Sequence, residues 1–330
     1  MPQINNYPGG FAAGITIRGL PIAVTHPGKV FWVGNASSSI SDRQISASDG
    51  NKGTFDAPFS TLAGGFSACV ADRGDVIMVK PGHAETVSAA GWMSFNKSGV
   101  AVIGLGVGSK RPTLTWSLAT STILVAANNV SIQNFLCLGG AATTFVATAF
   151  SVASAVVATD FTIDNCEFRD VDATHGFVSI VVQGGSTANA VDGLTFTNNK
   201  VFRYLTSPPA ANTAIVTTAA IDRPTFNDNF IVNKTANNNI ALGWAFGANA
   251  FQNAQFARNR TQSLNTGTTA GELWSGGSTT SCGLTWDNYV WHLAATGLIA
   301  PVSTKSGFAQ NFCSITGAAD KSPLLNPTAV

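Results

Sequence analysis

The chain has 330 residues, with 18 basic and 17 acidic side chains, a net charge of +1, 11% charged residues and 45% hydrophobic residues. Ordinary apolar content with so few charges excludes a disordered chain, and the near-zero net charge argues against a nucleic-acid or anionic-membrane partner. The 33 glycines and the frequent Asn, Ser and Thr favour a turn-rich β protein over a helical one.

Residues 1–28 are expected to form an extended arm, because Gly and Pro interrupt them too often for a core of their own. The first residues have neither the basic start nor the apolar run of a signal peptide. No stretch of the chain reaches the roughly 18 to 20 apolar residues that a spanning helix needs, so no membrane association is expected. The 5 cysteines are odd in number and form no CxxC pair, which favours folding in a reducing cytosol without a zinc site or a disulfide framework.

One amphipathic helix is predicted near residues 57–72. Pro58 suits a first helical turn, Phe59, Leu62, Phe66 and Val70 fall on one face, and a glycine at 74 is placed to end the helix. Such a helix would cover the open apolar end of the repeats that follow it.

From residue 130 onward a short phrase recurs, in which apolar residues alternate with polar ones and an Asn follows. The Asn residues are about 30 positions apart, a period typical of one solenoid coil per repeat, and they are Asn134, Asn165, Asn199, Asn229, Asn259, Asn288 and Asn311. Each coil then runs through short strands whose alternate side chains point into a shared interior, and the coils stack about 4.8 Å apart. Residues 75–80 and 100–105 are less regular units of the same kind, so the solenoid is expected to begin near residue 75.

Stacked coils align like residues into ladders. One interior stack is predicted from six residues, namely Ile132, Ile163, Phe196, Phe226, Phe256 and Trp286. The Asn after each is predicted to occupy a sharp turn, because Asn tolerates the left-handed conformation and its amides can bond from coil to coil.

Four segments near the N-terminal end of the chain resemble, in order, the segments with which a known protein family begins. Residues 29–35 (KVFWVGN), 49–51 (DGN), 56–62 (DAPFSTL) and 73–82 (RGDVIMVKPG) follow in that order. This order is similar to the first strand, "DG" turn, "APF-T-L" helix and "GD-I-V-PG" coil of the pectate-lyase-like superfamily. The resemblance implies an all-β fold, a single-stranded right-handed parallel β-helix over residues 29–317 with a short N-terminal capping helix, followed by a tail at 318–330.

Two groups of carboxylates are candidate sites, because glycoside hydrolysis needs two facing carboxylates about 5 to 9 Å apart. Asp228, Arg258 and Asp287 share one position on successive coils, which is typical of a charge-paired surface ladder. The second group is denser and consists of Asp160, Asp164, Glu167, Asp170 and Asp172. Its interpretation is a solvated strand edge, with a divalent cation as the alternative.

Catalytic signatures of the superfamily do not appear in sequence. The resemblance would call for "NTD", "DD" and "GHG" or for "WIDH", and the chain has only Gly82-His83-Ala84, Thr174-His175-Gly176 and Trp286-Asp287-Asn288. The four histidines (His26, His83, His175 and His292) are expected at the surface or in turns, and Trp274 is expected to be the exposed tryptophan. The glycine-rich residues 104–110 are interpreted as a solenoid turn. No catalytic, cofactor-binding or metal-binding residues are therefore predicted.

Bacteriophage virion proteins often use this fold, and the low charge and the Gly, Ser, Thr and Asn richness are similar to theirs. The resemblance implies a non-enzymatic virion structural protein on the capsid surface, made in the host cytoplasm. Within this class we expect a decoration (cement) protein that binds and stabilises the capsid shell through the major capsid protein or another virion protein. By analogy it is expected to be a homotrimer. The alternative is a tailspike or tail fibre that binds or depolymerises host surface polysaccharide.

Overall fold

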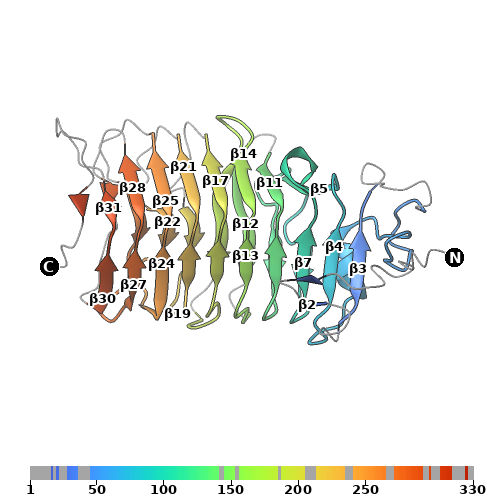
Figure 1. Ribbon diagram of the computed structural model, residues 1–330, viewed down its shortest axis with the longest axis horizontal. Coiled ribbons are helices and arrows are strands. Elements are labelled where there is room, and N and C mark those ends of the chain that lie inside the picture. Colours follow the sequence, from blue (N-terminus) through green and yellow to red (C-terminus); the bar gives the residue numbers. More distant parts are fainter. Residues whose placement is uncertain are drawn as a thin grey trace.

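The computed structural model describes residues 16–17, 20–21, 28–35, 45–140, 145–152, 156–184, 187–204, 213–234, 241–264, 271–292, 297–298, 305–313 and 324–325. They form an elongated solenoid whose strands stack along the long axis, with the N-terminal helix at one end (Figure 1). The predicted fold class, an all-β right-handed parallel β-helix with little helix, is confirmed. The predicted arm and tail lie outside the described residues, except for Gly28, β1 (Thr16–Ile17), β2 (Leu20–Pro21) and β32 (Leu324–Leu325).

Each regular coil gives one strand to each of three sheets, and the sheets contain ten, ten and eight strands. The first sheet comprises β3 (Val30–Val33), β4 (Val76–Val79), β7 (Ala101–Gly104), β10 (Ser131–Gln133), β13 (Thr162–Asp164), β16 (Thr195–Thr197), β20 (Thr225–Asn227), β24 (Ala254–Ala257), β27 (Cys282–Trp286) and β30 (Lys305–Ala309). The second comprises β5 (Ala84–Val87), β8 (Thr113–Trp116), β11 (Leu136–Gly139), β14 (Glu167–Asp170), β17 (Lys200–Arg203), β21 (Phe230–Asn233), β25 (Arg260–Ser263), β28 (Tyr289–His292), β31 (Phe312–Cys313) and β32. The third comprises β6 (Met93–Phe95), β9 (Ile123–Val125), β12 (Val146–Val152), β15 (Phe177–Gln183), β18 (Thr213–Val216), β22 (Ala241–Ala245), β26 (Gly271–Ser275) and β29 (Gly297–Leu298).

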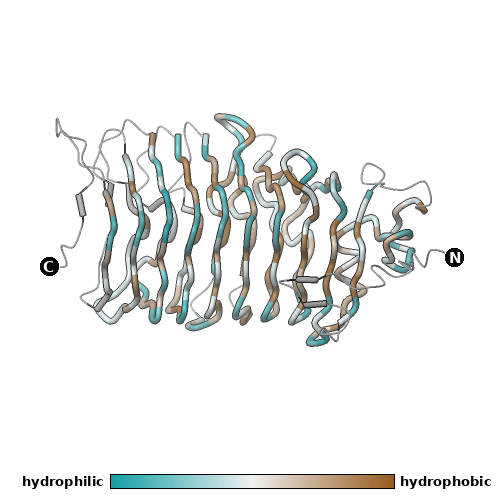
Figure 2. The backbone as a smooth tube through the Cα atoms, viewed as in Figure 1, coloured by the Kyte–Doolittle hydropathy of each residue, from teal (hydrophilic) through white to brown (hydrophobic). Residues whose placement is uncertain are grey.

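Two short elements lie in the turns. β19 (Ile221–Asp222) pairs with β23 (Phe251–Gln252), and a 3₁₀ turn, η2 (Gly108–Lys110), ends the glycine-rich segment between β7 and β8, which is a solenoid turn as predicted. Hydropathy changes repeatedly along each coil (Figure 2), as expected when alternate side chains point inward and outward.

The interior stack of the first sheet is confirmed for five of its six predicted members. Strand pairing aligns Ile132, Ile163, Phe196, Phe226 and Phe256, and the rings of Phe196 and Phe226 lie nearly parallel with centroids 5.4 Å apart. The prediction for Trp286 is wrong, because Thr285 pairs with Phe256 and the neighbouring tryptophan is half-buried on the outer face.

The turn between the first and second sheets contains two columns of residues where the sequence predicted one. The first column adopts the left-handed conformation, with φ between 51° and 62°, and consists of Asn134, Asn165, Asn198, Asp228, Arg258, Asp287 and Gln310. The second column, which we call the buried Asn ladder, consists of Asn199, Asn229, Asn259, Asn288 and Asn311. The single predicted column is therefore wrong by one residue from Asn199 onward, because Asn occupies both positions in that coil.

The buried Asn ladder joins successive coils through side-chain amides. The Oδ1 atom of Asn259 accepts from the backbone N–H of Asn229 at 3.1 Å and from its Nδ2 atom at 3.0 Å. The Nδ2 atom of Asn259 in turn donates to the Phe226 carbonyl at 2.6 Å and to Oδ1 of Asn288 at 2.9 Å. Buried polar groups are costly unless they are hydrogen-bonded. In this ladder the side-chain amides form those hydrogen bonds with the neighbouring coils.

At the N-terminal end the capping helix α2 (Leu62–Ala68) covers the interior. Thr61 caps its first turn, accepting from the Gly64 N–H at 2.9 Å, and Leu62 and Phe66 are buried against the first coils. The helix is shorter than the segment near 57–72, and Val70 lies beyond it with 48% of its surface exposed.

We predict that Asn259→Ala lowers the free energy of unfolding by about 2 kcal/mol, because two donors of Asn229 lose their common buried acceptor. Chemical denaturation followed by fluorescence of the buried tryptophans measures this change. Gln255→Ala, on the exposed face of the same coil, is the matched control and should change stability by less than about 0.5 kcal/mol. Equal effects of the two substitutions would show that the ladder contributes nothing specific.

We predict that Phe226→Asp is far more damaging, by more than about 4 kcal/mol, because it places an unpaired charge in the interior stack. Thr225→Asp tests the opposite face of the same strand and should be tolerated, since Thr225 points outward. Thermal unfolding by circular dichroism distinguishes them. If Phe226→Asp kept the stability of the wild type, the assigned register of β20 would be wrong by one residue.

Candidate functional site

The three residues Asp228, Arg258 and Asp287 lie together as predicted, on consecutive coils at the corner between the first and second sheets. All three adopt the left-handed conformation, with φ of 59°, 53° and 53°. That geometry turns each side chain outward while the following Asn enters the buried ladder.

A two-pronged ion pair links the first two of these residues. Arg258 donates from Nε and Nη2 to the two carboxylate oxygens of Asp228 at 2.7 and 2.6 Å, and this hydrogen bonding raises the pKa of the guanidinium. The side chains are 47% and 35% exposed, so solvent screens the pair and its stabilisation is at most about 1 kcal/mol. Asp228 is thus held by Arg258.

The corner residues line one side of a shallow hollow of about 300 Å³, and its full lining is Asp228, Asn229, Phe230, Arg258, Arg260, Asp287 and Tyr289. The Arg260 guanidinium lies 5.8 Å from the ring centre of Tyr289, a cation–π arrangement. The Tyr289 ring also stacks on the Phe312 ring, with centroids 4.9 Å apart. Tyr289 is 43% exposed. The hollow can therefore hold a polar ligand against an aromatic face.

Sequence reasoning missed the aromatic side of this hollow. Phe230, Arg260, Tyr289 and Phe312 each follow directly after a member of the buried Asn ladder, and strand pairing aligns them in one outer column. The residue types directly after the repeat Asn residues were the sequence signal that could have revealed this column.

The five carboxylates between residues 160 and 172 do not form one site. Asp164 accepts from Thr197 and Asn198, whereas Glu167 pairs with Arg169 and Arg111. Asp160 pairs with Arg223 at 3.4 Å, and Asp172 accepts from Thr174 and His175 in a tight turn. Within the described ranges, no group of three or more His, Cys, Asp or Glu side chains is arranged to hold a metal ion.

Asp170 departs from the prediction of a solvated strand edge, because it is 2% exposed. Its carboxylate accepts from the backbone N–H groups of Phe177 at 3.0 Å and Tyr204 at 2.8 Å. Arg203, on the next coil, is also buried and donates to the carbonyls of Phe177 and Val178. Burial lowers the pKa of Arg203 to about 10, and the two residues brace the corner where the third sheet begins.

His83 is 1% exposed and is therefore not a surface histidine, but it lies in a turn as expected, with its N–H donating to the Lys80 carbonyl at 3.2 Å. Its Nε2 atom lies 2.5 Å from Oε1 of Glu85, and the same oxygen accepts from the Leu62 N–H at the start of α2. The pair therefore joins the first coil to the cap. His175 lies in its turn as predicted, while His26 and the side chain of His292 lie outside the described residues.

The prediction that Trp274 is exposed is also wrong. Trp274 is completely buried and stacks on Phe256 with ring centroids 5.7 Å apart. Its strand β26 turns this residue inward at the position where β22 places the equally buried Trp244. These rings fill the interior.

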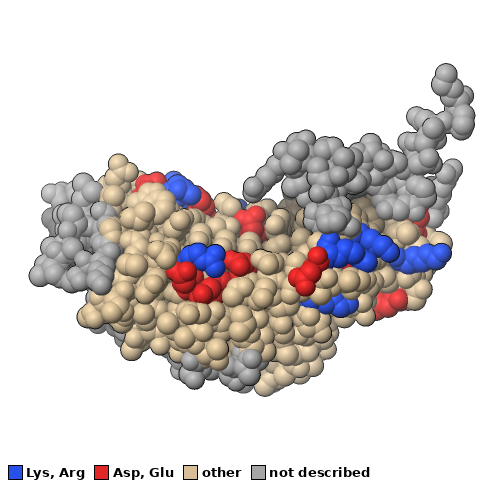
Figure 3. Space-filling model, turned by 90° about the horizontal axis from the view of Figure 1, so that it is seen from below, with Lys and Arg blue, Asp and Glu red and all other residues tan. Residues whose placement is uncertain are grey.

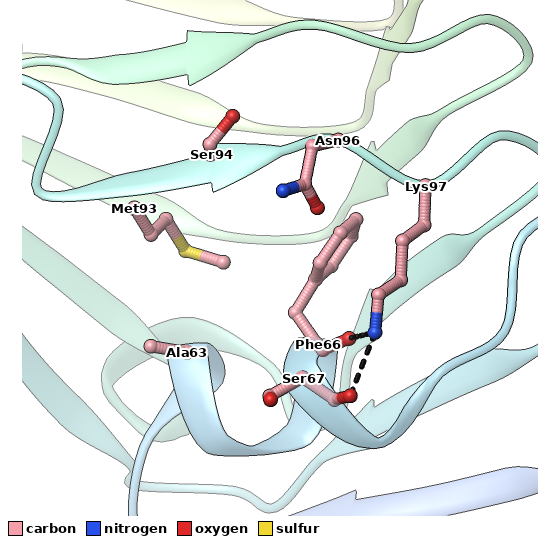
Figure 4. Close-up of a pocket in the computed structure, with 7 residues that line it drawn as sticks. All are labelled: Ala63, Phe66, Ser67, Met93, Ser94, Asn96 and Lys97. Atoms are coloured by element: carbon pink, nitrogen blue, oxygen red, sulfur yellow. Dashed lines mark hydrogen bonds between the residues drawn. The ribbon is translucent and has the colours of Figure 1, made fainter.

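A second hollow, of about 240 Å³, lies between α2 and β6 (Figure 4). Its edge is formed by Lys97, whose amine donates to the carbonyls of Phe66, Ser67 and Cys69 at 3.1, 2.6 and 2.6 Å. These are the last carbonyls of a helix, which favour a cation. The lysine therefore fixes the cap to the third sheet.

The charges on the face seen in Figure 3 occur in a few groups, some with acidic and basic side chains adjacent and one, at the right of the view, mostly basic. Most of that face carries no charge. In the part of the chain that the structure describes, no helix is long and apolar enough to cross a membrane.

No family model matches the chain, and no curated protein matches it. Among solved structures, the chain is similar to one described as "Rhamnogalacturonan lyase", with 13% sequence identity, 86% of this chain and 87% of that chain covered, and a TM-score of 0.47. At this identity and TM-score, the likeness carries no argument about what this chain does.

We predict that Asp228→Asn combined with Asp287→Asn changes the free energy of unfolding by less than about 1 kcal/mol, because the ion pair is exposed. Asn keeps the left-handed turn that Ala would strain, so the double variant tests charge alone. Thermal unfolding measures stability, and the release of reducing ends from polysaccharide measures cleavage. A cleaving activity in the wild type that this variant loses would contradict a non-catalytic corner.

Proposed function

We propose that the protein is a non-enzymatic structural protein of a bacteriophage virion, and specifically a decoration protein that stabilises the capsid shell. The proposal rests on the partners of the candidate catalytic carboxylates. Asp228 is held by Arg258, and Asp170 by two backbone N–H groups that brace a corner. Both carboxylates are therefore engaged in contacts within the solenoid.

The mechanical properties of the fold support this role. A continuous interior of stacked rings and a buried Asn ladder give a stiff rod, and most of the face seen in Figure 3 carries no charge. A stiff rod bridges shell subunits without bending, and neutral faces associate without large electrostatic repulsion. The proposed partners are the major capsid protein or another virion protein, and further copies of the chain in a homotrimer.

The N-terminal arm is the proposed anchor. Residues 1–28 carry short apolar patches in a Gly- and Pro-rich segment, and burial of such patches against a shell is favourable by about 25 cal/mol for each Å² removed from water. The arm ends where Lys29 enters the first coil, with its N–H donating to Asp75 at 2.7 Å. That bond ties the chain to the solenoid from Lys29 onward, so the proposal is that the coils fold without the arm.

A second candidate function is favoured by the hollow beside Tyr289. An exposed aromatic ring with Arg260 and Asp287 around it has the groups that hold a sugar ring and its hydroxyls. This arrangement supports a tail fibre that binds host surface polysaccharide. Depolymerisation would require two carboxylates about 5 to 9 Å apart and facing the bond to be cleaved, and Asp228 is engaged by Arg258.

We predict that deletion of residues 1–28 leaves a folded β-rich protein that no longer binds its particle. Circular dichroism measures the fold, and co-sedimentation with particles stripped of this protein measures binding. The full-length chain is the control in both assays. Retained binding by the truncated protein would move the contact to the faces of the solenoid and contradict the anchor.

Incubation with host surface polysaccharide separates the two functions. Released oligosaccharides would contradict the non-enzymatic proposal, whereas retention on a polysaccharide column without release would favour the fibre. The decoration role predicts neither release nor retention, together with co-sedimentation on stripped particles.

A further inference from the structure

We infer that residues 11–24 of the arm form a strap that lies on the outside of their own solenoid in the free chain. The strap covers what we call the outer apolar face, which is formed by outward side chains of β3, β4 and β7, namely Val30, Trp32, Val76, Met78, Ala101 and Ile103. The inference goes beyond the proposed function, because it concerns the chain before it meets any partner. A shell that binds the arm would replace this face as the partner of the arm.

The outer apolar face gives way to polar residues after β7. Strand pairing aligns its members in two outward columns, and each column continues with polar residues on the next three strands. The first column runs from Val30, Val76 and Ala101 to Ser131, Thr162 and Thr195, and the second runs from Trp32, Met78 and Ile103 to Gln133, Asp164 and Thr197. The inward residues of the same strands, such as Ile77 and Val102, belong to the main core. The outer apolar side chains are therefore not needed to fill the solenoid.

Three residues of this face point outward and yet are almost completely buried. Trp32 is 1% exposed, Val76 is 4% exposed and Met78 is 2% exposed. Outward residues of β10, namely Ser131 and Gln133, are only half-buried. Neighbouring strands cover the flanks of an outward side chain, but only a further layer covers its end. The burial of these three residues therefore calls for a layer outside β3 and β4.

Phe55 supplies one end of that layer. Its ring meets the Trp32 ring edge-on with centroids 4.9 Å apart, and its carbonyl accepts from the Lys80 amine at 2.7 Å. Both contacts lie toward the C-terminal ends of β3 and β4. Val76 lies at the other end of β4, about 13 Å along the strand from Lys80, so a second segment is required there.

The arm enters the solenoid at that other end. Gly28 packs so closely on Gly74 that an added Cβ atom would lie 2.0 Å from the Gly74 carbonyl oxygen, and the Lys29 carbonyl accepts from the Val76 N–H at 2.9 Å. Residues 25–28 can span up to about 13 Å, so the strap reaches the face directly. A segment tethered this closely has an effective concentration of about the millimolar range, which favours it over a second copy or a separate partner.

The composition and pairing of the strap fit this surface. Nine of its 14 residues are apolar, and Arg18 is its one charged residue. β1 and β2 pair as an antiparallel hairpin, which overlaps the first coils near β7 in the view of Figure 1. A two-stranded hairpin is marginally stable in water unless it packs on another surface. The edge of the first sheet is not that surface, because the backbone of β3 already pairs with Gly53 and Phe59.

Limited proteolysis of the full chain tests the inference, because Arg18 is the one trypsin site within residues 1–28. We expect trypsin to release residues 1–18 at least about tenfold more slowly than it cleaves a synthetic peptide of residues 11–24. Ile103→Glu, at a half-buried position of the face, should raise the rate at least about tenfold with an unchanged circular dichroism spectrum. Thr225→Glu, at an outward position of the same sheet four strands further on, is the matched control and should keep the wild-type rate.

A variant of the arm keeps the test decisive if Ile103→Glu does not fold. Ile15→Glu with Ile22→Glu changes the strap alone, and it should speed cleavage at Arg18 and increase the binding of an apolar dye to the outer apolar face. Wild-type cleavage as fast as that of the peptide, or protection that the arm variant retains, would overturn the inference. Protection that is lost on dilution would assign the strap to a second copy and overturn the contact within one chain. These measurements use no particles, so their outcome is independent of the proposed virion role.

Discussion

The structure depends on the hydrogen bonds by which one coil satisfies the turn of the next. At the corner between the first and second sheets, each coil from Asn198 onward places one residue in the left-handed conformation and the following Asn inside. The side-chain amide of Asn259, for example, accepts from Asn229 on the preceding coil and donates to Asn288 on the next coil. A slip of one residue would leave several buried donors without acceptors, so this corner fixes the register of the strands on both sides.

Register, once fixed, determines what lies on the surface. The residue before each ladder Asn points outward, which produces the Asp228, Arg258 and Asp287 column. The residue after it begins the outer face of the second sheet, which produces Phe230, Arg260, Tyr289 and Phe312. The hollow is therefore a consequence of the same turn, and the chemistry of these columns varies from coil to coil while their positions do not.

The sequence predicted the parts of the fold that a period reveals. Coil length, the interior stack from Ile132 to Phe256 and a helix in front of the first coils follow from spacing and apolar alternation. Spacing alone misplaced Trp286, because it precedes its Asn by two residues, as Ile132 does, whereas Thr285 occupies the stack. The spacing also placed the turn column and the buried Asn ladder in one column, because Asn198 and Asn199 are both Asn. Only the backbone conformation distinguishes a turn residue from a ladder residue. The burial of Asp170 depends on backbone N–H groups of Phe177 and Tyr204, which lie 7 and 34 residues further along the chain, and that of His83 depends on the cap that packs over its neighbour Glu85; no local pattern encodes either.

Hydrogen exchange at the ladder amides tests the central claim most directly. The backbone N–H groups of Asn199, Asn229, Asn259 and Asn288 donate to the side chain of the next ladder Asn at 2.9 to 3.1 Å. If these bonds fix the register of the solenoid, the four amides exchange as slowly as those of the interior strands, through opening of the coils themselves. Exchange at the rate of exposed turn amides would contradict the account, because it would show that the corner opens while the sheets remain paired.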